Sequence, residues 1–168
     1  MFGKGDKIVY PMHGAGVIEG LEEKQIDGKA ATYYILSIPI GNLTITVSSQ
    51  KAEVLGIRSV TTKEEALNIL ASIKEIPCDI PENWNKRYEY NLEKIKSGEM
   101  GQVLEVYICL YLREREKGLS SLEKKLLSTS KQVLLSELIV SQNIEKEAAE
   151  DMLKSILKRF QDKIDAST

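Results

Sequence analysis

The spacing of apolar residues changes near residue 60, and this change divides the chain into two kinds of structure. Before that point, apolar and polar residues alternate over short runs, most clearly in residues 43–47, as is typical of half-buried strands. From Thr62 onward, apolar residues recur every three or four positions, as is typical of amphipathic helices. We therefore predict an α+β protein with two domains, a β domain at residues 1–60 and a helical domain at residues 61–168.

The first domain is predicted to contain short strands separated by tight turns. The predicted strands cover residues 7–10, 17–25, 32–38, 43–47 and 57–60. Residues 13–16 are glycine-rich and are predicted to form a turn, and Asp27-Gly28 is a hairpin turn of the kind that favours positive φ. Five such strands in about 60 residues predict a small, bent β-barrel of the SH3 or Tudor type.

The second domain is predicted to be an all-α bundle of about five helices. The predicted N-caps are Thr62, Asn83, Ser120 and Asn143. Thr62 and Ser120 each have a glutamate three residues later, which completes a capping box. Pro77 is predicted to end the first of these helices, and Gly98 and Gly118 are predicted to stop two others.

The formal net charge of −2 argues against a protein that holds DNA by bulk electrostatics. Such proteins are usually clearly basic, so a nucleic-acid contact of this chain must be local or must be made through a partner. No apolar run approaches the roughly 20 residues needed to cross a bilayer, and the N-terminus does not resemble a signal peptide. We expect a cytoplasmic protein without membrane association.

The few cysteine and histidine residues argue against metal and nucleophile chemistry. Cys78 and Cys109 lack the spacing of a metal or redox motif, so we expect free thiols in a reducing compartment. His13 is the single histidine, which disfavours a histidine-based metal site or a catalytic triad. The pair Glu22-Glu23 is expected to be solvated surface. We expect no enzymatic activity and no cofactor or metal.

The one tryptophan, Trp84, stands at the start of a predicted helix that runs to about residue 96. At 100° per residue, Trp84 lies at the margin of an apolar stripe with Tyr88, Leu92 and Ile95. The adjoining face carries Lys86, Arg87, Tyr90, Asn91 and Lys94. Helix geometry leaves two interpretations open. Trp84 is either a core anchor beside solvated cations, or an exposed apolar wedge that meets nucleic acid.

Residues 2–14 have the sequence FGKGDKIVYPMHG, which resembles the opening of the CarD family of bacterial transcription regulators. Their Y-P-x-H-G core is also similar to the polymerase-interacting domain of the transcription-repair coupling factor. The strings that resemble the family's helical domain are Asn83-Trp84, Arg87-Tyr88, 91–94, 115–120 and Glu123-Lys124. The resemblance covers essentially the whole chain in the right order.

This resemblance implies that the Tudor-like domain binds the RNA polymerase β subunit. It also implies that the helical domain lies against promoter DNA at the upstream edge of the melted region, where Trp84 would push into the minor groove and stabilise the open complex. An inserted apolar side chain offsets unstacking costs of a few kcal/mol per step. Recruitment by polymerase would raise the effective concentration of DNA, which compensates for the weak bulk charge.

The resemblance assigns two sets of contact residues. The predicted DNA-binding residues are Trp84, Lys86, Arg87, Asn91 and Lys94. The predicted polymerase-binding residues are Lys24, Leu43, Thr44, Ile45, Thr46 and Val47. The sequence departs from familiar members at Glu89 and Thr46, where those members have basic residues. Backbone pairing along an exposed barrel edge would tolerate the change at Thr46, because main-chain hydrogen bonds do not depend on the side chain.

We therefore expect a monomeric transcription factor that binds polymerase and, through it, promoter DNA. Trp84 should then be partly exposed in the free protein. The alternative is a protein–protein adaptor that binds through the barrel and keeps Trp84 in the helical core. The exposure of Trp84 separates these two interpretations.

Overall fold

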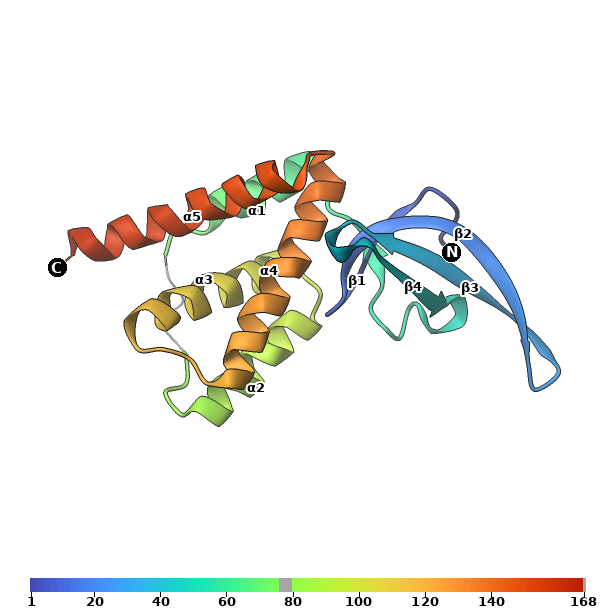
Figure 1. The fold of residues 1–168 in the computed structure, drawn as a ribbon, viewed down its shortest axis with the longest axis horizontal. Coiled ribbons are helices and arrows are strands. Elements are labelled where there is room, and N and C mark those ends of the chain that lie inside the picture. The colour runs from blue at the N-terminus through green and yellow to red at the C-terminus, as the bar shows by residue number, and fades with distance from the viewer. Residues whose placement is uncertain (76–79, 168) are drawn as a thin grey trace.

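The computed structural model describes residues 1–75 and 80–167, and its strands precede its helices along the chain. Figure 1 shows the strands gathered at one end of the molecule and the helices at the other. The predicted α+β class is therefore confirmed. Pro77 and Cys78 lie outside the described residues. In the described part of the chain, no helix has both the length and the apolar character needed to cross a membrane.

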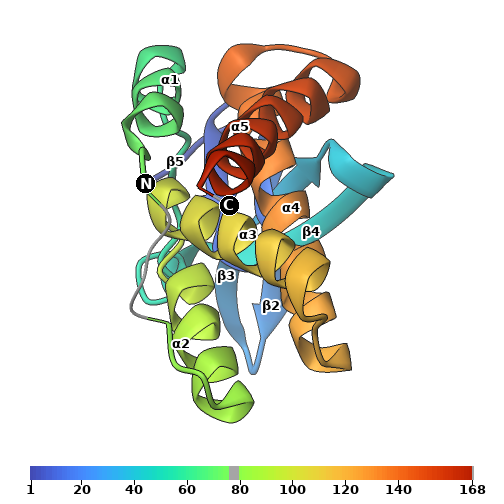
Figure 2. The same ribbon diagram turned by 90° about the vertical axis from the view of Figure 1, so that its left-hand side faces the viewer.

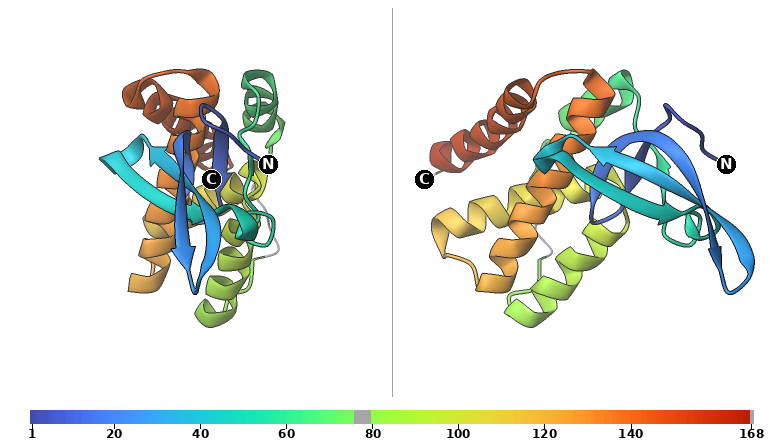
Figure 3. Two further views of the ribbon diagram at one scale, coloured as in Figure 1. Left: turned by 90° about the vertical axis from the view of Figure 1, so that its right-hand side faces the viewer. Right: turned by 45° about the vertical axis from the view of Figure 1, so that its right-hand side comes forward.

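The strands form one antiparallel sheet in the order β4-β3-β2-β1-β5. Their bounds are β1 Lys7–Tyr10, β2 Gly14–Ile26, β3 Lys29–Ile38, β4 Leu43–Ser48 and β5 Arg58–Ser59. Short 3₁₀ turns, η1 Ile40–Asn42 and η2 Ser49–Lys51, flank β4. The strand order leaves β4 at one edge of the sheet. The long β2–β3 hairpin extends away from the helices, as Figures 1 and 3 show.

One face of the sheet holds the core of this domain. Its buried apolar side chains are Ile8, Ile18, Tyr34, Leu36, Ile38, Val47, Ala52 and Ile57. The alternation predicted for the fourth strand is confirmed in part, because Val47 is buried and Ile45 is partly buried while Thr44 and Thr46 are exposed. Leu43, at the start of the strand, is exposed as well. In β3, alternate residues Tyr34, Leu36 and Ile38 face the core, as the pleat of a half-buried strand requires.

The predicted turn at residues 13–16 is wrong, because Gly14 to Gly16 already belong to β2. Tyr10 pairs with Gly14 and Val9 pairs with Ala15, so the reversal occurs over residues 11–13 instead. Met12 takes up the tight geometry there with a φ of 72°. Gly14 and Gly16 therefore allow neighbouring segments to approach β2 closely, and they do not form a turn.

In the described parts of the chain, five helices follow the sheet, which agrees with the predicted number. Their bounds are α1 Lys63–Ser72, α2 Trp84–Lys96, α3 Met100–Glu116, α4 Ser121–Gln142 and α5 Lys146–Ala166. Both predicted capping boxes, at Thr62 and at Ser120, are present. The prediction for Asn143 is wrong. Asn143 ends α4 in the left-handed conformation that asparagine tolerates, and α5 begins after Glu145.

The helices pack around α3 and α4. Figures 1 and 2 show α3 lying between α2 on one side and α5 on the other. The buried apolar residues that α3 and α4 contribute to the largest cluster are Met100, Val103, Leu104, Tyr107, Ile108, Leu112, Val133, Leu134, Leu135 and Leu138. A smaller cluster joins Ile95 of α2 to Val106, Leu110 and Leu126. This second cluster fixes α2, and with it Trp84, to the bundle.

Candidate functional site

Trp84 is the first residue of α2 and remains half-exposed. Asn83 caps the helix, since its Oδ1 accepts hydrogen bonds from the backbone N–H groups of Asn85 at 3.0 Å and Lys86 at 3.3 Å. The Trp84 side chain is 45% exposed. The expectation of partial exposure is confirmed, and the interpretation that buries Trp84 in the helical core is wrong.

Arg87 does not lie on an exposed cationic face, and that expectation is wrong. Its side chain is only 4% exposed, and its Nε donates a short hydrogen bond to the Glu123 carboxylate. Its Nη1 donates to the Glu82 carbonyl oxygen at 2.7 Å. The guanidinium therefore joins the start of α4 to the segment that leads into α2, and its charge is already paired within the protein.

The Glu123 carboxylate accepts hydrogen bonds from two partners at the start of α4. Its Oε2 accepts from the backbone N–H of Ser120 at 3.1 Å, which closes the capping box, while Oε1 accepts from Arg87. Burial by itself would raise the pKa of Glu123, but the hydrogen bonds from Arg87 and Ser120 outweigh it and lower the pKa. The carboxylate is thus charged at neutral pH. The sequence identified Glu123 as a cap but gave no sign of its pairing with Arg87.

Two further predicted DNA-binding residues also face the inside of the protein. Asn91 is 2% exposed, and its Nδ2 has no hydrogen-bond partner among the described residues. The Lys94 ammonium forms an ion pair with Glu105 of α3 and lies 5.0 Å from the centre of the Tyr90 ring. Burial works to lower the pKa of Lys94, but the hydrogen bond and charge of Glu105 outweigh it and raise the pKa. Lys94 is therefore a stable cation with its own carboxylate partner.

The residues on either side of Trp84, Asn83 and Asn85, are exposed, as are Lys86 and, further along α2, Glu89. Two cations from the end of α3, Arg113 and Lys117, also line a hollow of about 190 Å³ beside Pro81 and Glu82 at the entry to α2. These cations could not be related to the entry of α2 from the sequence, because they come from a different helix and no local spacing connects them.

The predicted polymerase-binding residues lie on the edge strand β4 and on the hairpin beside it. Leu43 is 47% exposed although it is apolar, and Thr44 and Thr46 are also exposed. Ile45 is half-buried, whereas Val47 faces the core, which leaves only its backbone for a partner. Within the described residues, β4 pairs with β3 alone, so its outer edge presents backbone groups that an added strand could bind.

Lys24 lies on β2, two strands away from that edge. Its partner across the hairpin is Ala31, beyond the point where β3 pairs with β4. The Lys24 ammonium lies 5.5 Å from the centre of the Tyr33 ring and 3.9 Å from the Glu22 carboxylate. The contact with Glu22 is an exposed one, of the kind that contributes little to stability, so Lys24 remains accessible.

Comparison with known proteins gives one family match for the strands and another for the helices. A family model described as "CarD, C-terminal domain" matches residues 66–154, and one described as "CarD-like/TRCF RID domain" matches residues 2–61. The chain belongs to the CarD family. It is also 38% identical over 144 residues to the Bacillus subtilis protein named "Putative transcription factor YdeB", a match that covers 86% of this chain and 94% of that relative.

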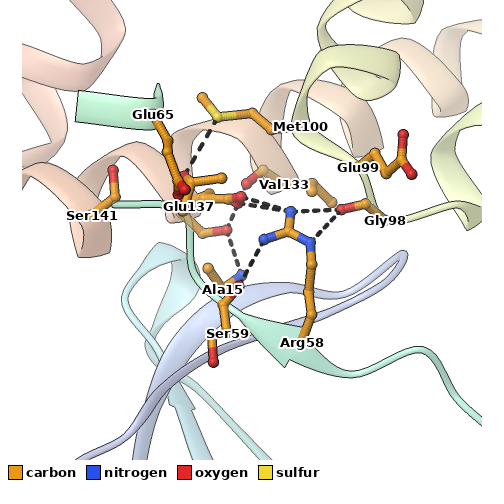
Figure 4. A network of polar contacts seen from close by, with 12 residues as sticks. Ala15, Arg58, Ser59, Glu65, Gly98, Glu99, Met100, Val133, Glu137 and Ser141 are labelled. Carbon is orange, nitrogen blue, oxygen red and sulfur yellow. Dashed lines mark hydrogen bonds and ion pairs between the residues drawn. The ribbon is translucent and has the colours of Figure 1, made fainter. Parts of the chain in front are cut away.

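In this CarD-family chain, a polar seam joins the sheet to the helices (Figure 4). Arg58 of β5 donates from Nη2 to the Glu137 carboxylate of α4 at 2.7 Å and to the Gly98 carbonyl oxygen at 2.6 Å. The Ser136 hydroxyl accepts from the Ala15 backbone N–H at 2.8 Å. These contacts lie beside an apolar cluster formed by Val9, Ala15, Val60 and Val140. The sheet therefore packs directly against α4 in a fixed arrangement.

Proposed function

We propose that this protein binds the β subunit of RNA polymerase through its Tudor-like sheet and stabilises the open promoter complex through Trp84. The observation that carries the proposal is the exposure of a tryptophan at the first position of a rigidly held helix. Large aromatic side chains usually dominate cores, so a half-exposed one at a helix start needs an explanation. Insertion between base steps at the edge of the bubble supplies one.

Arg87 supports this role through contacts within the protein and not through the predicted contact with phosphate. The buried Arg87–Glu123 pair holds the start of α2 against α4, directly beneath Trp84 in the helix. A side chain that wedges DNA open must keep its position under load, because flexibility at its base would weaken insertion. Arg87 acts here by holding Trp84 in position. Lys86, which is exposed on the first turn of α2, can approach phosphate.

The polymerase contact is proposed along the outer edge of β4, with Leu43, Thr44 and Thr46 as its exposed side chains. Edge pairing supplies main-chain hydrogen bonds, and the exposed Leu43 adds apolar contact area. The ion pair between Arg58 and Glu137 would then fix the orientation of the helices relative to the bound sheet. The protein itself performs no chemistry in this proposal, and it acts by binding energy alone.

The wedge is tested by replacing Trp84 with alanine in the full chain. We expect polymerase binding to remain unchanged while the lifetime of the open complex on a promoter falls to that measured without the protein. Leu67→Ala is a matched control, because Leu67 is 43% exposed on α1 and lies outside the proposed DNA contact. A Trp84→Ala protein that prolongs the lifetime as well as the wild type would exclude the wedge.

The β4 contact is tested by Leu43→Glu and Thr44→Glu, which place charges on the exposed edge. We expect both to weaken binding to the isolated β subunit, measured by biolayer interferometry. Leu21→Glu is the control, since Leu21 is 50% exposed but lies on β2, away from the edge. Equal losses for all three variants would show that the contact is elsewhere on the sheet.

A further inference from the structure

A hollow of about 340 Å³ lies between α3, α4 and α5. Its lining residues are Tyr107, Tyr111, Arg115, Lys131, Lys154, Leu157, Lys158, Gln161 and Asp162. In Figures 1 and 2, α5 and α2 lie on opposite sides of α3, so this cationic cleft is separate from the Trp84 surface. A role at the promoter fork therefore does not account for it.

The cleft concentrates positive charge in a chain whose net charge is −2. Four of the residues that line the cleft are cations, and Asp162 is the one carboxylate in the lining. Lys131 comes from α4, whereas Lys154 and Lys158 come from α5. Among the ion pairs of the described residues, none involves these three lysines. They are therefore available to an anion.

The helix dipole does not explain these lysines. A helix end favours cations within its last turn, but α5 continues to Ala166, well beyond Lys154 and Lys158. Lys131 likewise lies in the middle of α4, which ends at Gln142. Lys154 and Lys158 are exposed and Lys131 is partly buried, so their ammonium groups can reach a ligand in the cleft.

Two tyrosines line the cleft, and Tyr107 is almost fully buried whereas Tyr111 is partly exposed. The ring centres of Tyr107 and Tyr111 lie 6.5 Å apart, and Arg115 donates from Nη1 to the Tyr111 hydroxyl at 3.2 Å. Burial, with smaller contributions from Tyr111 and Glu150, raises the pKa of Tyr107 to about 12. The Tyr107 phenol therefore stays protonated and remains a hydrogen-bond donor at neutral pH.

We infer that this cationic cleft binds a phosphorylated small molecule with a planar ring, of the nucleotide class. Lysine and arginine pair with phosphate oxygens, and the partly exposed Tyr111 ring offers an apolar surface on which a base can pack. The volume lies at the lower end of the range for small-ligand pockets, which suits a single nucleotide. A hollow between helices fits a compact ligand better than the convex backbone of duplex DNA.

The test is isothermal titration calorimetry of the full chain with adenosine triphosphate and guanosine triphosphate. Inorganic triphosphate and a short DNA duplex serve as separate probes. We expect at least one nucleotide to bind, and to bind more tightly than inorganic triphosphate. Lys131→Ala and Lys158→Ala should each weaken that binding by about tenfold, since each removes a charge-assisted contact. Lys125→Ala is the matched control, because Lys125 is exposed on α4 but does not line the cleft.

Three results would overturn the inference. The first is the absence of nucleotide binding, and the second is nucleotide binding that Lys131→Ala and Lys158→Ala leave unchanged. The third is binding of inorganic triphosphate or duplex DNA that equals or exceeds nucleotide binding and depends on the same lysines. That third result would assign the cleft to phosphate groups alone. Circular dichroism of each variant establishes that lost binding is not lost folding.

Discussion

Arg58 and Glu137 form an ion pair across the seam between the sheet and the helices, with 2.7 Å between Nη2 and Oε1. The Glu137 side chain is 2% exposed and that of Arg58 is 29% exposed. Burial raises the pKa of Glu137, and Arg58 opposes this without reversing it. The pair therefore couples the two halves of the chain and leaves a buried carboxylate dependent on one cation.

We expect Arg58→Ala to lower the free energy of unfolding by about 3 kcal/mol at neutral pH, because it leaves the Glu137 carboxylate buried without its partner. A carboxyl whose pKa is raised in the folded protein makes its full contribution to stability at pH values below its ordinary pKa. That contribution is lost as the pH rises through the pKa of the folded state. The cost of Arg58→Ala should therefore shrink as the pH is lowered. Urea unfolding at neutral and at mildly acidic pH measures both quantities.

The control for this prediction removes both charges together. In Arg58→Met/Glu137→Leu, no unpaired charge remains, and apolar replacement of a buried pair is often neutral. The double variant should therefore be more stable than Arg58→Ala at neutral pH. A double variant as unstable as Arg58→Ala would show that the seam depends on the hydrogen bond from Arg58 to the Gly98 carbonyl oxygen instead.

We expect Arg87→Ala to destabilise the protein by about 3–5 kcal/mol, because it leaves the buried Glu123 carboxylate without its cation. Lys86→Ala, one position earlier and exposed, should change the free energy of unfolding by less than about 0.5 kcal/mol. Chemical denaturation of the two variants makes the comparison. An Arg87→Ala protein with wild-type stability would mean that Arg87 is free to contact DNA, as the sequence suggested.

Glu123 should make the protein sensitive to acid. Its folded pKa is lowered, so its stabilising contribution is present above the ordinary carboxyl pKa and is lost as pH falls through the folded value. We expect the wild type to lose stability on acidification more steeply than Glu123→Gln, although Glu123→Gln is less stable at neutral pH. Unfolding free energies measured across the acidic range test this, and parallel curves would contradict it.

Local patterns along the chain were enough to predict most of the elements. The bounds predicted for α2 agree with the structure because Asn83 and Gly98 are strong local signals at its two ends. The prediction for Asn143 is wrong because asparagine suits both an N-cap and a left-handed C-cap, and only the chain direction after α4 selects between them. The turn predicted at residues 13–16 is wrong because glycine also allows strands to approach closely.

The environment of Arg87 could not be predicted from periodicity. A helical wheel correctly placed Arg87 beside the apolar stripe of α2, but it could not show that α4 covers that face. Glu123 is 36 positions away, and nothing in its local sequence distinguishes a capping glutamate from one that also pairs with an arginine. Trp84 was easier to place, because the first residue of a helix has no preceding turn to cover it.

Close packing of β2 against β3 should make Gly16 intolerant of any side chain. A Cβ at Gly16 would lie 2.2 Å from the backbone oxygen of Ser37, so we expect Gly16→Ala to destabilise by about 3 kcal/mol. Gly20→Ala on the same strand should be neutral or slightly stabilising, because no atom lies within 4 Å of its Cβ position. Thermal unfolding followed by circular dichroism compares the two, and equal losses would contradict this account of β2.

The exposure of Trp84 predicts how its fluorescence responds to each partner. In the free protein, a 45% exposed indole should be readily quenched by acrylamide. Because polymerase has tryptophans of its own, the chain is best labelled with 5-hydroxytryptophan, which can be excited selectively. We expect polymerase alone to leave the quenching nearly unchanged, and a forked promoter added to that complex to protect the indole strongly. Protection by polymerase alone would place Trp84 against protein instead of DNA, and the wedge would have to be abandoned.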